Sequence, residues 1–254
     1  TLNKSKLAKA LSIGLVSSSF ALMGCQEQKA DTPTSNTAAP TQSQVSITTR
    51  EQSESLSGEY AAMRATQVSN VKYNLAFTID NKSEQFSGRT ELFFDLAENN
   101  KNDLTIDFDE GTVKSVSING KPAQYEYEKW FITIPATELT AGKTSIIVEF
   151  ERPYSTDGSG FHRFVDPENG EVYLYTDFEP YNANQLFPHF DQPDLKATYT
   201  MQVTSPKHWQ IITSVRENTI EEQGENLAFP RVSQVFFVHF LASRRQLRCM
   251  GRQI

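Results

Sequence analysis

Apolar and mostly polar side chains alternate along residues 71–80, and this pattern constrains the fold more than any other feature of the sequence. Successive side chains of a β-strand point to opposite faces, so a period of two predicts a strand with one buried face. The predicted buried face consists of Val71, Tyr73, Leu75, Phe77 and Ile79.

The same alternation recurs along the chain, and no long run with a helical period of 3.6 residues interrupts it. Turns are predicted at 81–83, at Asn119-Gly120 and at 166–170, because Asn-Gly and polar, glycine-containing clusters favour tight turns. The sequence therefore predicts an all-β, antiparallel fold of saddle-like or sandwich-like form. Its 17 Phe and 9 Tyr can fill a sizeable core. Further strands are expected at 86–96, 104–108, 116–118, 130–134, 146–150, 172–176, 197–203 and 209–214.

The first 24 residues have the pattern of an export signal. Lys4, Lys6 and Lys9 precede an apolar stretch at 11–23, which is shorter than the roughly 20 residues that span a bilayer. The stretch ends in Leu-Met-Gly-Cys, which resembles a bacterial lipobox; an ordinary signal with a chance cysteine is the alternative. The resemblance implies that Cys25 is lipidated and holds the protein on the cell envelope membrane. Gln26, in place of Asp, favours the outer membrane.

Residues 25–58 are rich in Ser, Thr, Gln, Ala and Pro and have no apolar periodicity. Such a composition is typical of a disordered segment, so we expect a tether between Cys25 and the folded body. The body is expected at 59–228.

Composition and motifs exclude several function classes. A net charge of −7 argues against nucleic-acid binding, which needs a basic surface. Two Cys give neither a disulfide framework nor a multi-cysteine zinc site. None of the four His lies in an H-E-x-x-H motif, and no G-x-S-x-G or phosphate-binding glycine loop is present. His189 and Asp191 flank Phe190, but a structural loop is favoured there over a metal site. We therefore predict no catalytic residue and no metal ligand in this chain.

The stretch 160–197, GFHRFVDPENGEVYLYTDFEPYNANQLFPHFDQPDLKA, is the most specific part of the sequence. It resembles the N-terminal domain of the aminopeptidase N family of zinc peptidases, whose pattern is G-(L/F)-(H/Y)-R, T-Q-F-E-x-x-x-A-R and F-P-C-F-D-(E/Q)-P-x-x-K-A. Weaker similarity extends over about 63–220. The matching residues are Gly160, Phe161, His162, Arg163, Thr176, Phe178, Glu179, Ala183, Phe187, Pro188, Phe190, Asp191, Gln192, Pro193, Lys196 and Ala197.

This resemblance implies a β-saddle that caps a catalytic domain. Glu179 matches the family carboxylate that binds the protonated α-amine of a peptide substrate, a charge-assisted contact. Asp177 replaces the family Gln that shapes the first side-chain pocket, which adds a negative charge and favours basic side chains. Two further departures are Asn184 in place of Arg and His189 in place of Cys. The family's zinc belongs to its catalytic domain, so no cofactor is expected in this chain.

The segment 229–254 has five Arg and no acidic residue, an abrupt change from the acidic body. We expect a frameshifted or truncated end before the family's G-x-M-E-N and H-E-x-x-H motifs; a divergent terminal strand with a basic tail is the alternative. The functional hypothesis is therefore a substrate-capping domain that is inactive without its catalytic domain. The alternative hypothesis is a free-standing β-sandwich lipoprotein that binds a ligand or a protein at the cell surface.

Overall fold

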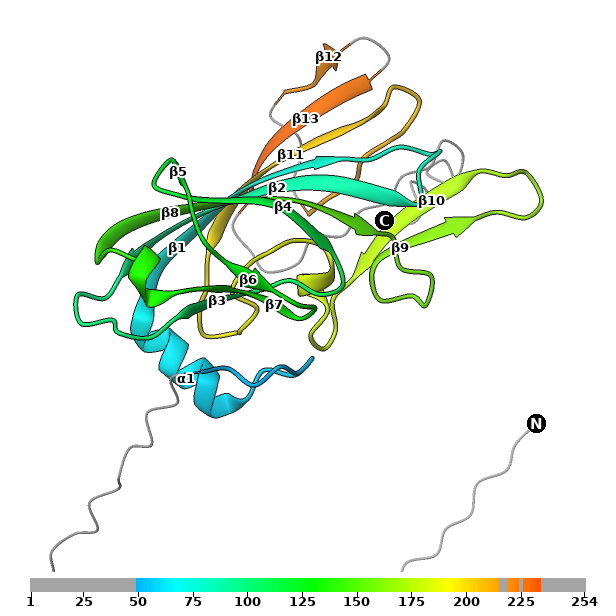
Figure 1. The fold of residues 1–254 in the computed structure, drawn as a ribbon. Helices are drawn as coiled ribbons and strands as arrows, with labels where there is room; N and C mark the ends of the chain where they lie inside the picture. Colours follow the sequence, from blue (N-terminus) through cyan, green and yellow to red (C-terminus); the bar gives the residue numbers. More distant parts are fainter. Residues whose placement is uncertain (1–48, 215–218, 224–225, 234–254) are drawn as a thin grey trace, which may run out of the picture. The chain divides into compact units, whose positions relative to one another are not determined.

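The alternating strands form one eight-stranded sheet in the order β12-β13-β11-β1-β2-β8-β4-β5, seen in Figure 1. This computed structural model describes residues 49–214, 219–223 and 226–233. The predicted signal, Cys25, most of the predicted tether and the tail beyond residue 233 lie outside the described residues. The strands are β1 (Val68–Thr78), β2 (Gln85–Leu96), β4 (Thr112–Ile118), β5 (Lys121–Pro122), β8 (Gly142–Pro153), β11 (Thr198–Pro206), β12 (Glu221–Gln223) and β13 (Asn226–Ser233).

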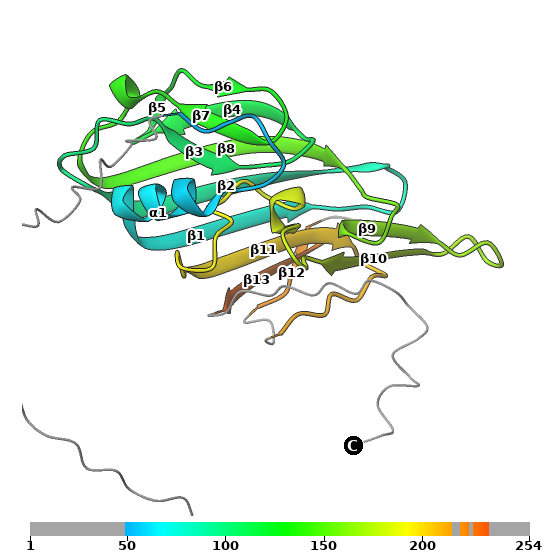
Figure 2. The ribbon, with the colours of Figure 1, turned by 90° about the horizontal axis from the view of Figure 1, so that it is seen from below.

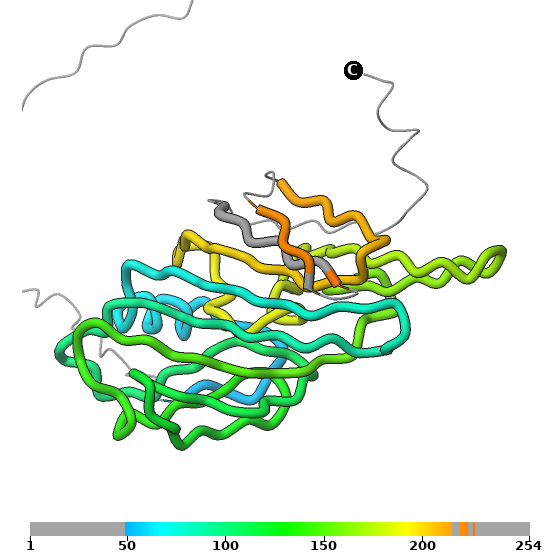
Figure 3. Tube along the Cα trace, turned by 90° about the horizontal axis from the view of Figure 1, so that it is seen from above, coloured from blue at the N-terminus to red at the C-terminus, as the bar shows by residue number. Residues whose placement is uncertain are grey.

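The long strands β1, β2 and β8 run side by side at the centre of this sheet (Figure 3). Their pairing places Leu75 opposite Thr90 and Thr90 opposite Val148, so that the predicted apolar faces are on the same side. Leu92, Ile146 and Val148 are completely buried. The predicted all-β fold and its buried face are thus confirmed. Within the sheet, however, β1 and β11 are parallel, so the pairing is not antiparallel throughout.

A three-stranded sheet, in the order β3-β7-β6, packs into the same hydrophobic core (Figure 2). It consists of β3 (Leu104–Asp107), β6 (Glu126–Tyr127) and β7 (Phe131–Ile134), and a 3-10 turn, η1 (Ala136–Glu138), follows β7. All four residues of β3 are buried, whereas the alternation predicted one buried face. β3 is therefore covered on both sides.

A hairpin of β9 (Gly160–Val165) and β10 (Val172–Asp177) forms a separate two-stranded sheet. The predicted turn between its strands is confirmed, since Gly170 donates its N–H to the Asp166 carbonyl at 2.8 Å. The Asn119-Gly120 turn is confirmed as well. Both of its residues have positive φ angles, of 49° and 79°, as a tight hairpin requires.

One helix, α1 (Gly58–Gln67), was not predicted. The Ser57 hydroxyl caps it by accepting a bond from the Tyr60 N–H at 3.2 Å. The helix buries Tyr60, Arg64 and Gln67, which recur at helical spacing. Only one of these three side chains is aromatic or aliphatic, so the hydrophobic pattern is too weak to reveal the helix in the sequence.

Three predicted boundaries need correction. Residues 49–58 were assigned to the tether, yet Arg50 is 7% exposed and packs into the body. Residues 209–214 were predicted as a strand but have no regular structure, although Trp209 and Ile211 are buried. The tail was predicted to begin at 229, but β13 pairs with β11 through to Ser233 opposite Tyr199. In the part of the chain that the structure describes, no helix is long and apolar enough to cross a membrane.

Two adjacent residues of β2 test the one-sided burial of the large sheet. Leu92 is fully buried, whereas Phe93 points to the other face and is 37% exposed. We expect Leu92→Ala to lower the free energy of unfolding by about 2–5 kcal/mol, because it leaves a cavity in the core. The matched Phe93→Ala should change it by less than about 1 kcal/mol. Urea unfolding of both variants measures the difference, and equal losses would contradict the assignment of the faces.

Candidate functional site

The segment 178–195, called the site loop here, continues from the end of β10 and contains the 3-10 turn η2 (Ala183–Gln185). Its backbone is bonded to β3 and to the residues just after it. The Asp107 N–H donates to the His189 carbonyl at 2.8 Å, and the His189 N–H donates back to the Asp107 carbonyl at 3.1 Å. The Asp109 N–H donates to the Asn184 carbonyl at 3.0 Å. These bonds place an irregular segment against a rigid strand.

The Asp107 carboxylate is the centre of a buried polar cluster beneath the site loop. It is ion-paired with Arg50 and, at 2.8 Å, with Arg64. It also accepts hydrogen bonds from the Asp191 N–H at 2.8 Å and the Tyr181 hydroxyl at 3.1 Å. Burial raises the pKa of this carboxyl, but the charges of Arg64 and Arg50 outweigh burial and lower the pKa to about 2. Asp107 is therefore charged at neutral pH and binds the loop to the body.

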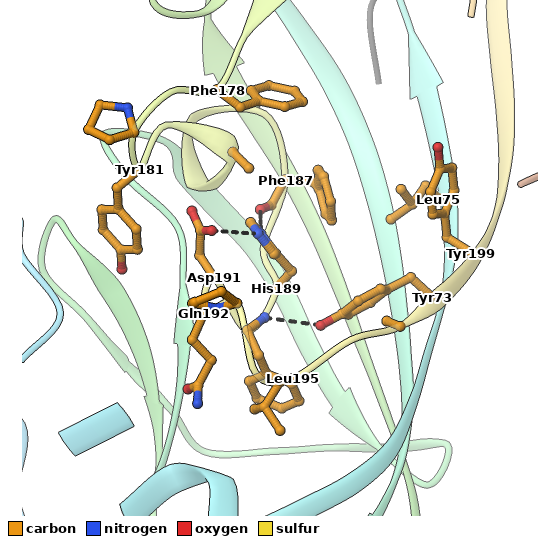
Figure 4. Close-up of a pocket in the computed structure, with 15 residues that line it drawn as sticks. Tyr73, Leu75, Phe178, Tyr181, Phe187, His189, Asp191, Gln192, Leu195 and Tyr199 are labelled. Atoms are coloured by element: carbon orange, nitrogen blue, oxygen red, sulfur yellow. Dashed lines mark hydrogen bonds and ion pairs between the residues drawn. The ribbon is translucent and has the colours of Figure 1, made fainter. Parts of the chain in front are cut away.

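An apolar pocket of about 250 Å³ lies between the site loop and strands β1 and β11. Aromatic rings from both sides line it, and Figure 4 shows them around the pocket. Tyr73 belongs to β1, Tyr199 to β11, and Phe178, Tyr181 and Phe187 to the site loop. The Tyr73 hydroxyl accepts a hydrogen bond from the Phe190 N–H at 3.1 Å, which holds the loop against β1.

His189 is buried in the wall of this pocket, and both of its ring nitrogens lie near groups of the site loop itself. Its ring stacks on Phe187 with 4.4 Å between the centroids, and its Nδ1 lies 2.9 Å from the Phe187 carbonyl. Its Nε2 lies 3.5 Å from the Asp191 carboxylate, an interaction drawn in Figure 4. Burial lowers the pKa of His189, but Asp191 and the Phe187 carbonyl outweigh it, so the pKa is raised overall. Within the described residues no three His, Cys, Asp or Glu side chains gather as metal ligands.

The two predicted substrate-binding residues, Asp177 and Glu179, lie together at the end of β10, and both are exposed. The Asp177 carboxylate accepts the Glu179 N–H at 3.2 Å, so it is directed back toward its own turn. The Asn182 side-chain amide donates to the Glu179 carbonyl at 2.8 Å. Their neighbours Phe178 and Pro180 line the apolar pocket. Glu179 is thus an exposed residue between two pocket-lining residues, on a backbone that is bonded on both sides.

Four residues of the buried cluster were missed by the sequence analysis: Arg50, Arg64, Asp107 and Tyr181. Arg50 lay in the predicted tether, and Arg64 in a segment without recognised structure. Asp107 lay at a position that alternation assigned to the opposite face from Leu104, Ile106 and Phe108. The one signal available in the sequence was Asp107, an acidic residue within a mostly apolar strand. If such a residue is buried, it needs a partner, so its position pointed to a buried polar cluster.

The chain thus combines an open mixed sheet and two smaller sheets with an irregular, aromatic-rich loop. The model of the Peptidase M1 N-terminal domain family matches residues 69–233. The chain belongs to this family. The matched region includes β1 from Ser69 onward, the β9–β10 hairpin, the site loop and all of β13.

Two curated relatives agree with this assignment. Aminopeptidase N of Streptomyces lividans is 34% identical over 163 residues, which cover 63% of this chain and 19% of that protein. Glutamyl aminopeptidase of Homo sapiens is 30% identical over 146 residues, which cover 52% of this chain and 15% of that protein. The chain thus spans less than a quarter of the length of these relatives.

A solved structure has the same fold. The M1 zinc metallopeptidase of Deinococcus radiodurans, in a variant bound to a Tyr-Ser-Ala substrate, superposes with a TM-score of 0.57 at 17% identity. The superposition covers 70% of this chain and 42% of that one. Zinc is the metal of M1 peptidases, but the described residues of this chain provide no cluster of ligands that would fit it.

The low pKa of Asp107 predicts an acid-labile cluster. Because its pKa is about 2 in the folded chain, against an ordinary 3.8, the carboxylate contributes stability above pH 4 that is lost as the pH falls toward 2. A shift of this size corresponds to about 2 kcal/mol. In Asp107→Asn, which is less stable at pH 7, the free energy of unfolding should depend less on pH between 4 and 2. Urea titrations at several pH values measure this, with the exposed Glu168→Gln as control. Identical acid dependence in the wild type and Asp107→Asn would contradict the cluster's role.

Proposed function

We propose that the folded body is the substrate-capping domain of a zinc aminopeptidase and that Glu179 binds the free α-amine of the peptide. The observation that carries this proposal is that Glu179 is exposed and lies between the pocket-lining Phe178 and Pro180, within a family-matched loop. A carboxylate and an ammonium group form a charge-assisted hydrogen bond, which is roughly twice as strong as a neutral one. A peptide with a blocked N-terminus cannot form it.

The backbone around Glu179 supports a binding role. The Glu179 N–H is bonded to Asp177 and its carbonyl to Asn182, so the direction of the side chain is constrained before substrate arrives. Such preorganisation reduces the entropy that binding would otherwise cost. Bond cleavage is assigned to a separate catalytic domain, and this chain supplies binding and orientation.

Asp177 extends the proposal to side-chain preference. Its carboxylate lies beside Glu179, so two negative charges occupy the same exposed turn. One of them is sufficient for the substrate amine. The second favours peptides whose first side chain is basic, because unlike charges attract at short range even in water.

For the cellular location, we propose an envelope lipoprotein anchored through Cys25. Residues 1–24 act as the signal peptide, and the tether predicted at 25–58 ends before Arg50, which is buried. The support is the pattern of Lys4, Lys6 and Lys9, the apolar stretch and the lipobox-like end in the sequence. The absence of Asp at position 26, which is Gln, favours the outer membrane.

A chimera tests the role of Glu179. Residues 49–233 replace the matching segment of the Streptomyces lividans aminopeptidase N, and hydrolysis of aminoacyl anilides is measured. Glu179→Ala should lower kcat/KM by about 10- to 100-fold, which is the loss of one hydrogen bond to a charged group. Glu168→Ala, in the exposed hairpin turn, is the matched control and should leave kcat/KM unchanged. An unaffected Glu179→Ala chimera would refute amine binding by this residue.

The lipid anchor is tested by fractionation of a bacterium that expresses the full chain. Cys25→Ala should move the protein from the membrane pellet to the soluble envelope fraction, because it removes the thiol that carries the acyl chains. Thermal unfolding should be unchanged, since Cys25 lies outside the described body. Recovery of Cys25→Ala in the pellet would show that another segment binds the membrane.

A further inference from the structure

Arg50 is the single buried residue among residues 49–59, all of which the structure describes. This segment has no helix or strand before α1, and its other side chains are exposed or half-buried. One guanidinium therefore fastens the segment to the body. An arginine is costly to bury unless its hydrogen bonds are made, so its partners indicate what it holds.

Its partners include residues of β3, β7 and the site loop. The guanidinium is ion-paired with Asp107 of β3 and lies 4.2 Å from the ring centroid of Phe131 in β7. Its Nη2 donates to the Tyr181 hydroxyl of the site loop at 3.3 Å. Arg50 thus connects the N-terminal segment, the three-stranded sheet and the site loop.

Neutralising Asp107 does not require Arg50. Arg64 already pairs with the same carboxylate at 2.8 Å and also donates to the Thr105 carbonyl at 3.1 Å. Arg64 contacts the site loop at its other end, where its Nε donates to the Gln192 side-chain carbonyl at 2.5 Å and its guanidinium lies 5.6 Å from the Phe190 ring centroid. Arg50 differs from Arg64 in its contacts with Phe131 and Tyr181, and of these two residues Tyr181 belongs to the site loop.

Tyr181 lies two residues after Glu179 and bonds this end of the loop to the body through its side chain, whereas the Asn184–Asp109 bond is made by the backbone. Its hydroxyl donates to Asp107 at 3.1 Å and accepts from Arg50. Burial raises the pKa of this hydroxyl, so it stays protonated and continues to donate. The next residue, Asn182, bonds the Glu179 carbonyl and, through its N–H, the Phe178 carbonyl at 3.1 Å. A short bonded path thus leads from Arg50 through Tyr181 to the Glu179 backbone.

We propose that Arg50 is a positioning residue that orders the Glu179 end of the site loop through Tyr181. The segment 49–57 is thereby part of the binding site's support, although it lies outside the family-matched region, which begins at residue 69. The structural step, ordering of the loop, stands alone; its consequence for peptide binding rests on the proposed function of Glu179.

Hydrogen exchange of the full chain, read by mass spectrometry, tests the structural step. Arg50→Met should increase exchange in peptides that cover 178–186 by about 10-fold, as expected for the loss of a hydrogen-bonded anchor. Peptides from β1, β2 and β8 should be unchanged, because Arg64 still pairs with Asp107. Tyr181→Phe should reproduce the effect, and combining it with Arg50→Met should add little. Gln52→Ala, an exposed neighbour in the same segment, is the matched control.

Two results would overturn the proposal. One is unchanged exchange at 178–186 in Arg50→Met. The other is a uniform increase over the whole large sheet, which would make Arg50 a stability residue only. Arg50→Lys separates charge from geometry, because a lysine ammonium cannot reproduce the planar fork that reaches both Asp107 and Tyr181. Arg50→Lys should therefore still show part of the increase in exchange at 178–186. Exchange equal to that of the wild type would contradict the geometric argument.

The chimera described above separates this inference from the proposed function. There Arg50→Met should raise KM several-fold with a smaller change in kcat, since it loosens the amine anchor without removing it. If Glu179→Ala has no effect while exchange at 178–186 still responds to Arg50→Met, amine binding fails and loop positioning holds. If Glu179→Ala lowers kcat/KM while exchange ignores Arg50→Met, amine binding holds and the positioning role fails.

Discussion

The Asp107 carboxylate determines how four separate parts of this chain come together. It lies in β3 without contact to solvent and binds Arg50 from the N-terminal segment, Arg64 from α1, and Tyr181 and the Asp191 N–H from the site loop. An unpaired charge in a protein interior costs several kcal/mol, so the buried carboxylate needs a cationic partner and hydrogen-bond donors, and these come from elements that are distant in the sequence. The fold of the sheet and the order of the loop are consequently linked through one side chain.

The structure separates its charged residues by role. Charges that are buried, such as Asp107 and Arg64, have several partners each and hold elements in place. Asp177 and Glu179, at the end of β10, are exposed instead. The hydrogen bonds around them involve the backbone of their own turn. The rigid core therefore presents a carboxylate whose position is set by the backbone while its charge stays available to a ligand. This arrangement suits a domain that binds substrate for chemistry performed elsewhere.

Two departures from the family pattern have a simple structural explanation. The Asn184 backbone accepts from Asp109 and donates to the Asp191 carboxylate, and the His189 backbone exchanges two hydrogen bonds with Asp107. At both positions the backbone makes the bonds that shape the loop. Replacing the family's Arg and Cys side chains leaves those bonds intact, so the loop keeps its shape. A fold that tolerates 17% identity to the Deinococcus peptidase depends in the same way on sheet pairing and apolar faces more than on individual side chains.

The sequence by itself determined which residues of the central strands face the core, where the Asn119-Gly120 and 166–170 turns lie, and which loop carries Glu179. These features follow from local patterns, because strand alternation, turn chemistry and a dense motif are each written within a few consecutive residues. The helix α1 left too weak a pattern, with one aromatic side chain among its three buried positions. The Arg50–Asp107 and Tyr181–Asp107 contacts join residues 57 and 74 positions apart, and no local periodicity encodes such pairs. Only the tertiary structure decided that Asp107 is buried, because a strand is covered on its second face by segments that arrive from elsewhere in the chain.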